Sequence, residues 1–291
     1  MKRVCVIGGA GFLGSHVADA LTDSGYQVSI YDRNPSPWQR ADQKMIVGDI
    51  LDGQALSAAI SEVDIVYNFA ALADLNLALD KPLETIQINI LGNAQVLELC
   101  RQHQIKRFVY ASTVYVHSRE GGFYRCSKQA AESYVEEYQR TFGLDFTILR
   151  FGSLYGPRAD QGNGLYRMVK QILRTGELRY EGSPDALREY IHVTDAAMAS
   201  VAALGDVFCN QSVVLTGQEP MRVLDLLGMI GEILGLQKSV ELIAGEQPGH
   251  YVRTPYAYQS KIGRKYVPPV HVDLGQGLLE LIEIVQNERL G

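Results

Sequence analysis

The sequence predicts an α/β fold in which a doubly wound parallel sheet is followed by a smaller C-terminal α/β lobe. Three observations lead to this prediction. Short strands rich in Val, Ile and Tyr alternate with amphipathic helices through the first half of the chain. A glycine-rich stretch follows the first of these strands and opens a helix. The alternation then loosens after Tyr155-Gly156-Pro157, where the second part of the chain begins.

The first half of the chain contains the candidate strands and helices of the sheet. The strands are expected at Arg3–Ile7, Gln27–Tyr31, Lys44–Val47, Ile65–Phe69, Phe108–Tyr110 and Phe146–Leu149. The helices between them are expected at Leu13–Ser24, Gly53–Ile60, Pro82–Gln102 and Ser127–Thr141. Parallel strands joined through helices need right-handed crossovers, which place helices on both faces of one sheet.

The second half has a looser pattern, so we expect a boundary near residue 155. Residues 1–155 would form the sheet domain. Residues 156–291 would form mainly the second lobe, with part of 186–210 returning to the sheet. Helix patterns recur in this half at Leu165–Thr175, Arg222–Leu234 and Leu274–Glu288.

The composition excludes several classes of function. The chain of 291 residues is 46% hydrophobic and has a net charge of −6 without a basic block, so neither nucleic acid nor an anionic membrane is an expected partner. No apolar stretch reaches the length of a membrane span. The 4 cysteines and 6 histidines show no metal-ligand spacing, so no metal site is expected. Scattered cysteines are typical of a reducing compartment, which predicts a cytoplasmic protein.

The stretch Val4–Gly14, VCVIGGAGFLG, has the glycine spacing of a loop that binds a dinucleotide. Gly8 permits a tight turn from strand to helix, and Gly11 allows the backbone to approach a pyrophosphate. Gly14 lets the helix pack close to the strand, so that the N-terminal amides of the helix face the anion. Glycine-rich turns are common, but this one lies between a predicted strand and a predicted helix. That context indicates a Rossmann-type dinucleotide site.

Asp32 lies at the end of the second predicted strand, in YDRN. An acid at this position accepts hydrogen bonds from the adenosine ribose hydroxyls and repels a 2′-phosphate, which favours NAD over NADP. Arg33 follows directly and would partly offset that repulsion. The alternative role for Asp32 is that of a turn residue before Asn34-Pro35. Because the glycine loop precedes it, we predict that the cofactor is NAD.

Tyr124 and Lys128, in GGFYRCSK, are four residues apart and would share one face of a helix. In isolation such a pair is usually an ordinary part of an amphipathic surface. In a chain that also carries the glycine loop and Asp32, the pair favours an active-site couple. The lysine would then lower the pKa of the tyrosine from its usual value of about 10.

Together these motifs resemble those of the extended short-chain dehydrogenase/reductases that act on nucleotide sugars, the NAD-dependent epimerases and dehydratases. The resemblance extends over nearly the whole chain. It is carried by Gly8–Gly14, Gly48-Asp49-Ile50, Asn68–Ala71, Asn89, Ser112-Thr113, Tyr124–Lys128, RFGSLYGPR at Arg150–Arg158, REYIHVTD at Arg188–Asp195, and Val214–Gly217. It implies that NAD is bound by Gly8, Gly11, Phe12, Leu13, Gly14, Asp32, Arg33, Asp49, Ile50, Phe69, Ala70, Ala71, Tyr124 and Lys128.

The resemblance also implies a chemistry. Enzymes of this kind oxidise a sugar carbon, usually C4, to a ketone and later return the hydride. Tyr124 would take the hydroxyl proton as a phenolate, and Lys128 would support that charge and hold the nicotinamide ribose. Thr113, or Ser112 beside it, would hydrogen-bond the same sugar oxygen.

The identity of this hydroxyl residue depends on how the strand is counted. Counting forward from Phe108 places Thr113 at the catalytic position. Counting back from Tyr115 places Ala111 there, because the loop that follows is shorter than in the family. Asn89, in the preceding helix, is expected to cap or bridge backbone groups rather than to act directly.

A nucleotide-diphosphate sugar is the substrate that the resemblance implies. Arg188 is the first candidate to bind its diphosphate, through charge-assisted contacts, and the alternative is a salt bridge with Glu189. Arg253 is a second phosphate candidate. Ser153 would also contact the substrate, at a position where the family usually has asparagine.

Two departures from the family limit which of its reactions we expect this chain to catalyse. The residues after Thr113 are Val114-Tyr115-Val116, without the Asp-Glu pair of the dehydratases, so dehydration is disfavoured. The loop 114–123 is also short, which leaves the specific sugar open. We therefore expect an epimerase acting at C4. The alternatives are a reductase or dehydrogenase of a keto-sugar nucleotide, a decarboxylase using Glu120 as its acid, or a non-catalytic NAD-binding protein.

The same resemblance predicts a homodimer. The predicted helices Pro82–Gln102 and Ser127–Thr141 are similar to those that form a four-helix dimer interface in the family. Ile90, Val96 and Leu97 fit such an interface, and they fit packing on the sheet equally well.

Overall fold

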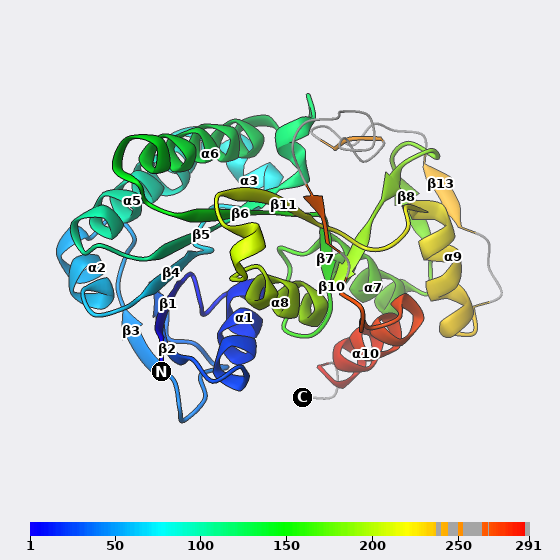
Figure 1. Ribbon diagram of the computed structural model, residues 1–291. Helices are drawn as coiled ribbons and strands as arrows, with labels where there is room; N and C mark the ends of the chain where they lie inside the picture. The colour runs from blue at the N-terminus through cyan, green and yellow to red at the C-terminus, as the bar shows by residue number, and fades with distance from the viewer. Residues whose placement is uncertain (237–239, 244–249, 253–263, 267, 289–291) are drawn as a thin grey trace.

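The structure is a computed structural model that describes residues 1–236, 240–243, 250–252, 264–266 and 268–288. Within these ranges its largest element is a sheet of eight strands in the order β14-β11-β6-β5-β4-β1-β2-β3, in which every neighbouring pair is parallel (Figure 1). The strands are β1 (Arg3–Ile7), β2 (Gln27–Asp32), β3 (Lys44–Val47), β4 (Ile65–Asn68), β5 (Arg107–Thr113), β6 (Phe146–Phe151), β11 (Gln211–Leu215) and β14 (Arg264–Lys265). The predicted doubly wound parallel sheet is confirmed.

Helices cover both faces of this sheet. On one face lie α1 (Phe12–Asp23) and α8 (Val193–Ala202), and on the other lie α2 (Gly53–Ile60), α5 (Asn93–Gln102) and α6 (Gly122–Phe142) (Figure 1). Successive residues of a strand point to opposite faces, so each strand supplies two cores. In β1, Val4 and Val6 join the core under α1, whereas Cys5 and Ile7 join the core under α5 and α6.

The C-terminal lobe has an apolar core of its own. It contains α7 (Gly164–Thr175), α9 (Val223–Ile233), α10 (Leu274–Asn287) and the paired strands β8 (Arg179–Glu181) and β13 (Glu241–Ile243). Val169, Leu226 and Leu281 are buried where the three helices meet. Two further short strand pairs are β7 (Ser153–Tyr155) with β10 (Tyr190–His192) and β9 (Leu187–Arg188) with β12 (Met221–Arg222).

Three elements differ from the predicted ones in ways that affect the site. Strand β5 continues past Tyr110 to Thr113, because it pairs with β6 from Phe108 to Thr113. Helix α6 begins at Gly122 rather than Ser127, since Gly121 adopts the left-handed conformation, with φ of 96°, at its N-cap. The predicted helix 82–102 contains a π-helical segment, η1 (Gln87–Gly92), between α4 (Pro82–Ile86) and α5. Such segments often mark functional sites.

The division of the chain near residue 155 stays a prediction. Within 186–210, the part expected to return to the sheet, α8 packs beside α1. The strand that joins the sheet follows this segment, at β11. None of the helices in the described ranges combines the length and apolar character needed to cross a membrane.

Candidate active site

The carboxyl ends of the central strands meet at a cavity of about 740 Å³. Ligands of doubly wound sheets bind at this edge, beside the point where the strand order reverses, which here lies between β1 and β4. All the residues predicted to act in catalysis or to bind the cofactor line this cavity: Gly8, Gly11, Phe12, Leu13, Gly14, Asp32, Arg33, Asp49, Ile50, Phe69, Ala70, Ala71, Ser112, Thr113, Tyr124 and Lys128.

The glycine loop is shaped by backbone packing. Gly8 has φ of 79°, and a Cβ on it would lie 2.4 Å from the Ala70 amide nitrogen. A Cβ on Gly14 would lie 2.2 Å from the Gly8 carbonyl oxygen. A Cβ on Gly11 would come no closer than 3.3 Å, to the same oxygen. Gly8 and Gly14 are thus required by the protein's own backbone, whereas Gly11 leaves the surface of the loop open to a ligand.

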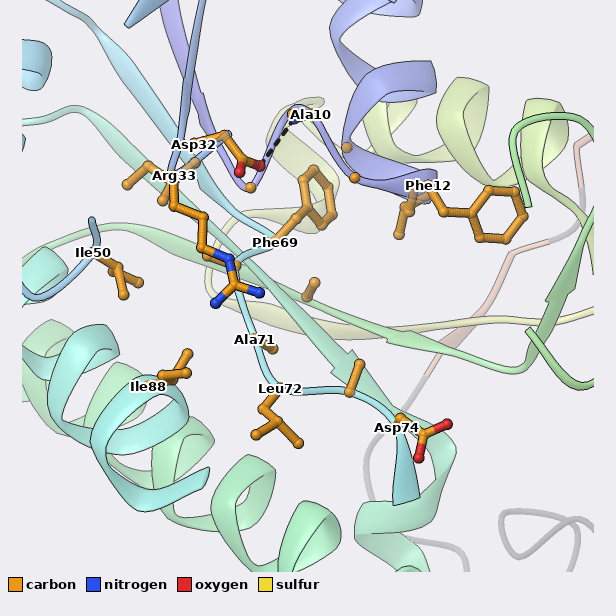
Figure 2. A pocket seen from close by; sticks show the side chains of 18 of the residues that line it. Ala10, Phe12, Asp32, Arg33, Ile50, Phe69, Ala71, Leu72, Asp74 and Ile88 are labelled. Carbon is orange, nitrogen blue, oxygen red and sulfur yellow. Dashed lines mark hydrogen bonds between the residues drawn. The ribbon is translucent and has the colours of Figure 1, made fainter. Parts of the chain in front are cut away.

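Asp32 connects the second strand to the glycine loop. Its Oδ2 atom accepts a hydrogen bond of 3.1 Å from the Ala10 amide (Figure 2), and its Oδ1 atom accepts one of 3.1 Å from the Asn34 amide. Asp32 therefore also has the turn role that was its alternative. Arg33 extends its side chain into the cavity (Figure 2). Asp49 uses Oδ1 to accept from the Leu51 amide at 2.8 Å.

Asn89 has a larger part in the site than the sequence indicated. It lies in the π-helical segment and is 1% exposed. Its Oδ1 accepts from the Leu72 amide at 2.7 Å, and its Nδ2 donates to the Leu72 carbonyl at 3.0 Å and to Ser127 Oγ at 2.9 Å. Ser127 in turn donates to the Tyr124 carbonyl at 2.8 Å. Asn89 thus ties the loop after β4 to the first turns of α6.

Tyr124 and Lys128 lie on one face of α6 above the end of β5. The Tyr124 hydroxyl forms a hydrogen bond with the Thr113 side chain. Lys128 is 3% exposed, and its Nζ donates to the Ala111 carbonyl at 2.7 Å. The same Nζ lies 5.8 Å from the centre of the Tyr124 ring and 4.7 Å from that of Tyr110. Of the two positions that counting left open, Thr113 is the one that presents a hydroxyl to Tyr124.

Burial disfavours the charged form of each group. It therefore raises the pKa of the tyrosine and lowers the pKa of the lysine. Burial raises the pKa of Tyr124 to about 12, although the Thr113 hydrogen bond lowers it in part. Burial lowers the pKa of Lys128 to about 7, although the Glu132 carboxylate raises it in part. Tyr124 therefore favours its neutral form, whereas Lys128 titrates near neutral pH, so a tyrosinate here needs a positive charge beside it.

Ser112 points to a different partner from Thr113, as expected of adjacent residues on a strand. Its Oγ donates a hydrogen bond to Glu132. Glu132 also receives two bonds from Arg150, from Nε at 3.0 Å and from a terminal nitrogen at 2.6 Å. Ser112 lines the cavity, but its hydroxyl is engaged in this buried network.

The predicted substrate residues Arg188 and Ser153 lie outside this cavity, in a cluster around Tyr251 that also contains Tyr115. The Arg188 guanidinium stacks 4.4 Å from the centre of the Tyr251 ring. The Tyr251 hydroxyl hydrogen-bonds Ser153, and the Tyr115 and Tyr251 rings are 4.7 Å apart. Because Tyr115 follows Thr113 by two residues, this tyrosine–arginine cluster adjoins the end of β5. No sequence pattern pointed to Tyr251, because it lies far along the chain from its partners.

Arg188 has the properties of an anion-binding group. It is 8% exposed, and it forms no ion pair with any described residue. Its hydrogen bond within the described ranges is to the Leu187 carbonyl, at 2.9 Å. Glu189, the alternative partner, instead lies 3.6 Å from Lys265. Arg253, the second predicted phosphate ligand, is outside the described residues.

The family model for the NAD dependent epimerase/dehydratase family matches residues 4–214. The chain belongs to this family. A Bacillus subtilis protein described as an uncharacterized UDP-glucose epimerase, YtcB, is 26% identical over 274 residues, covering 84% of this chain and 87% of that protein. A UDP-N-acetyl-alpha-D-glucosaminuronate decarboxylase from Bacillus cytotoxicus is 27% identical over 246 residues, covering 75% of this chain and 76% of that one.

The fold has a close counterpart among solved structures. The UDP-glucuronic acid 4-epimerase of Bacillus cereus, crystallised with UDP-glucuronic acid and NAD, superposes with a TM-score of 0.85 at 24% identity. The match covers 99% of this chain and 100% of that one.

The cofactor of this epimerase/dehydratase family member is NAD. The residues present fit it. The left-handed turn at Gly8 packs directly on the backbone of residues 69 and 70. Gly11 lines the cavity, where its lack of a side chain leaves room for a ligand. Asp32 stands at the end of β2, where an acid matches the ribose hydroxyls of NAD.

Proposed function

We propose that this family member is an epimerase of a nucleotide-diphosphate sugar that acts at C4, by transient oxidation to a keto-sugar. The observation that carries this proposal is the arrangement of Thr113, Tyr124 and Lys128 at the cavity, together with the absence of a carboxylate from Val114-Tyr115-Val116, directly after Thr113. Bound NAD would supply a hydride acceptor and a positive charge close to the tyrosine. The chain's own side chains would orient the sugar hydroxyl and remove its proton.

In this proposal the three residues divide the work on one sugar hydroxyl. Thr113 orients the hydroxyl by hydrogen bonding. Tyr124 removes its proton, and the positive charge of protonated Lys128 stabilises the tyrosinate. The Thr113 and Tyr124 hydroxyls lie next to each other at the cavity, so one sugar hydroxyl could hydrogen-bond both of them.

The segment after Thr113 supports epimerisation over dehydration. Val114, which directly follows, is 1% exposed and packs with Val214 and Tyr251. Elimination of water needs an acid and a base at this place, and an apolar core contact supplies neither. Glu120, the candidate acid for decarboxylation, is exposed and does not line the cavity. Returning the hydride to the other face of a rotated ketone needs no further acid.

Arg188 is the group that we assign to the substrate diphosphate. A buried guanidinium without a carboxylate partner is costly, and a phosphate would compensate its charge. Tyr251 holds the guanidinium in one plane by stacking, which favours bidentate contacts. Ser153, bonded to the same tyrosine, would lie beside it.

The function is tested by incubating the purified protein with UDP-, GDP-, CDP- and dTDP-sugars and resolving the products by NMR. We expect one sugar to interconvert with its C4 epimer without added cofactor. We also expect Arg188→Met to raise KM by about 10- to 100-fold, since a hydrogen bond to a charged group contributes about 1.5–3 kcal/mol. Arg222→Met is the matched control, because Arg222 is exposed and pairs with Asp225. A dehydrated or decarboxylated product, or turnover only with added NADH, would refute the epimerase assignment.

We also propose a cytoplasmic homodimer. Its interface would use exposed apolar side chains on α4 and α6, including Leu83 at 74% and Tyr134 at 48% exposure. Val96 and Leu97 are fully buried against the sheet and belong to its core instead. Light scattering should give twice the chain mass of 32.2 kDa. Leu83→Glu should lower that mass toward the monomer, whereas Met198→Glu, on α8 at the opposite face, should not.

A further inference from the structure

The buried network behind the catalytic pair connects three separate elements. Glu132 is one helical turn after Lys128 on α6, and Arg150 is on β6. Ser112, on β5, stands directly opposite Arg150 in the strand register. Glu132 is 7% exposed, Arg150 is 7% exposed and Ser112 is 4% exposed, so all three polar side chains are removed from water.

The geometry of this network is that of a fixed carboxylate. Both Glu132 oxygens are engaged, Oε1 by Ser112 and by Arg150 Nε, and Oε2 by the Arg150 terminal nitrogen at 2.6 Å. A fork-shaped contact of this kind holds a carboxylate in one orientation. Because Ser112 adjoins Thr113, the same contact also fixes the end of β5 relative to α6.

Lys128 lines the cavity, whereas Glu132, one turn further along α6, does not. Tyr124 and Glu132 flank it from its own helix, one turn to each side, and Tyr110 faces it from β5. Arg150 on β6 pairs with Glu132, and the acidic residues that line the cavity from other elements are Asp32, Asp49, Asp74, Glu84 and Asp160. Among these groups, Glu132 is the carboxylate that acts on the charge of Lys128, and it opposes the effect of burial.

We propose that Glu132 is a positioning residue that acts through Lys128. Its carboxylate, clamped by Arg150 and Ser112, keeps the buried Lys128 ammonium charged and in place. The inference rests on the proposed function, in which that charge stabilises the Tyr124 phenolate. Glu132 does not line the cavity, but through Lys128 it would help Tyr124 to act as a base.

The direct test is to titrate Lys128 by NMR in protein labelled with ¹³C at the lysine ε carbon, as purified. Lys128→Arg identifies the signal by its absence. We expect Glu132→Gln to move the titration of Lys128 to lower pH, by about 1–3 units, because a nearby opposite charge has been removed. Since the ammonium is present only below its pKa, the alkaline limb of the turnover profile should move to lower pH as well.

Two further variants separate this role from a merely structural one. Glu137→Gln is the matched control: it makes the same change on the same helix, but Glu137 is exposed and bonds Arg140, so neither profile should move. Glu132→Gln leaves Arg150 buried without its carboxylate, which threatens folding. The variant Glu132→Gln/Arg150→Met removes both charges, and it should still show the lowered Lys128 titration.

The possible outcomes distinguish the two proposals. A folded double variant with the wild-type Lys128 titration would overturn the role of Glu132 and leave the proposed function intact. Full turnover by Lys128→Met would overturn the proposed function itself, whatever the titration of Lys128 in the Glu132 variants.

Discussion

Tyr124→Phe is expected to reduce turnover by about 10²- to 10⁴-fold, the range that positioned acid–base groups contribute. The substitution removes the hydroxyl that bonds Thr113 and leaves the ring, which packs beside Lys128. Because the proton of the sugar hydroxyl must leave as the hydride does, the variant should fail at the oxidation step itself. The measurement is the rate at which bound NAD becomes NADH, followed by absorbance after mixing with substrate.

The matched control for this prediction is Tyr138→Phe. Tyr138 lies on the same helix, and its hydroxyl donates to Glu98 at 3.3 Å, away from the cavity. This change should leave the rate within a factor of two or so, since partly exposed hydrogen bonds contribute only about 0.5–1.5 kcal/mol to stability and none to this step. Both variants should retain NAD on purification. Wild-type turnover by Tyr124→Phe would remove tyrosine from the mechanism and with it the assignment of an oxidative epimerase.

The parts of the site that the sequence predicts are those fixed by local backbone geometry. Gly8 and Asp32 each belong to a strand end whose position follows from the alternation of strands and helices, and both line the cavity. The spacing of Tyr124 and Lys128 predicts a shared helix face because a helix repeats every 3.6 residues. Such relations need no knowledge of what packs against them.

The parts that the sequence could not predict depend on contacts between distant residues. Tyr251 contacts both Arg188 and Tyr115, which are distant from it in the sequence, and no periodicity encodes that approach. In the sequence Glu132 is one of several acids on an amphipathic helix. Its ion pair with Arg150 forms only because β6 packs beside that helix. Asn89 was expected only to cap or bridge backbone groups. It does bridge Leu72 with two bonds, and its third bond, to Ser127, shows that the bridge also supports the first turns of α6.

The sequence also could not decide whether Ser112 or Thr113 presents its hydroxyl to Tyr124. Adjacent strand residues point to opposite faces, so only one of the two can meet Tyr124. The count along the sequence was ambiguous between Thr113 and Ala111, because the loop after this strand is shorter than in the family. Once the strand extends to Thr113, the pairing with β6 decides which hydroxyl faces Glu132 and which faces Tyr124.

Gly8→Ala is expected to abolish retention of NAD and to destabilise the fold. The new methyl group would lie 2.4 Å from the Ala70 amide nitrogen and 2.7 Å from the Phe69 carbonyl carbon, both backbone atoms that cannot turn away. To relieve the contact, the loop after β1 must move away from the loop after β4. Both loops line the cofactor cavity. The left-handed conformation of Gly8 adds about 1–3 kcal/mol of strain for a residue with a side chain.

A second glycine in the same conformation separates the two effects. Gly25, in the turn after α1, has φ of 83°, but a Cβ on it would meet nothing within 4 Å. Gly25→Ala should therefore show the strain alone, as a lowered unfolding midpoint with NAD still bound after purification. Gly8→Ala should show a larger drop, and the absorbance of released nicotinamide after denaturation should be lost. If both variants retained NAD equally, the close approach of Gly8 to Ala70 would have no part in shaping the site, because the strain is common to both and only the contact differs.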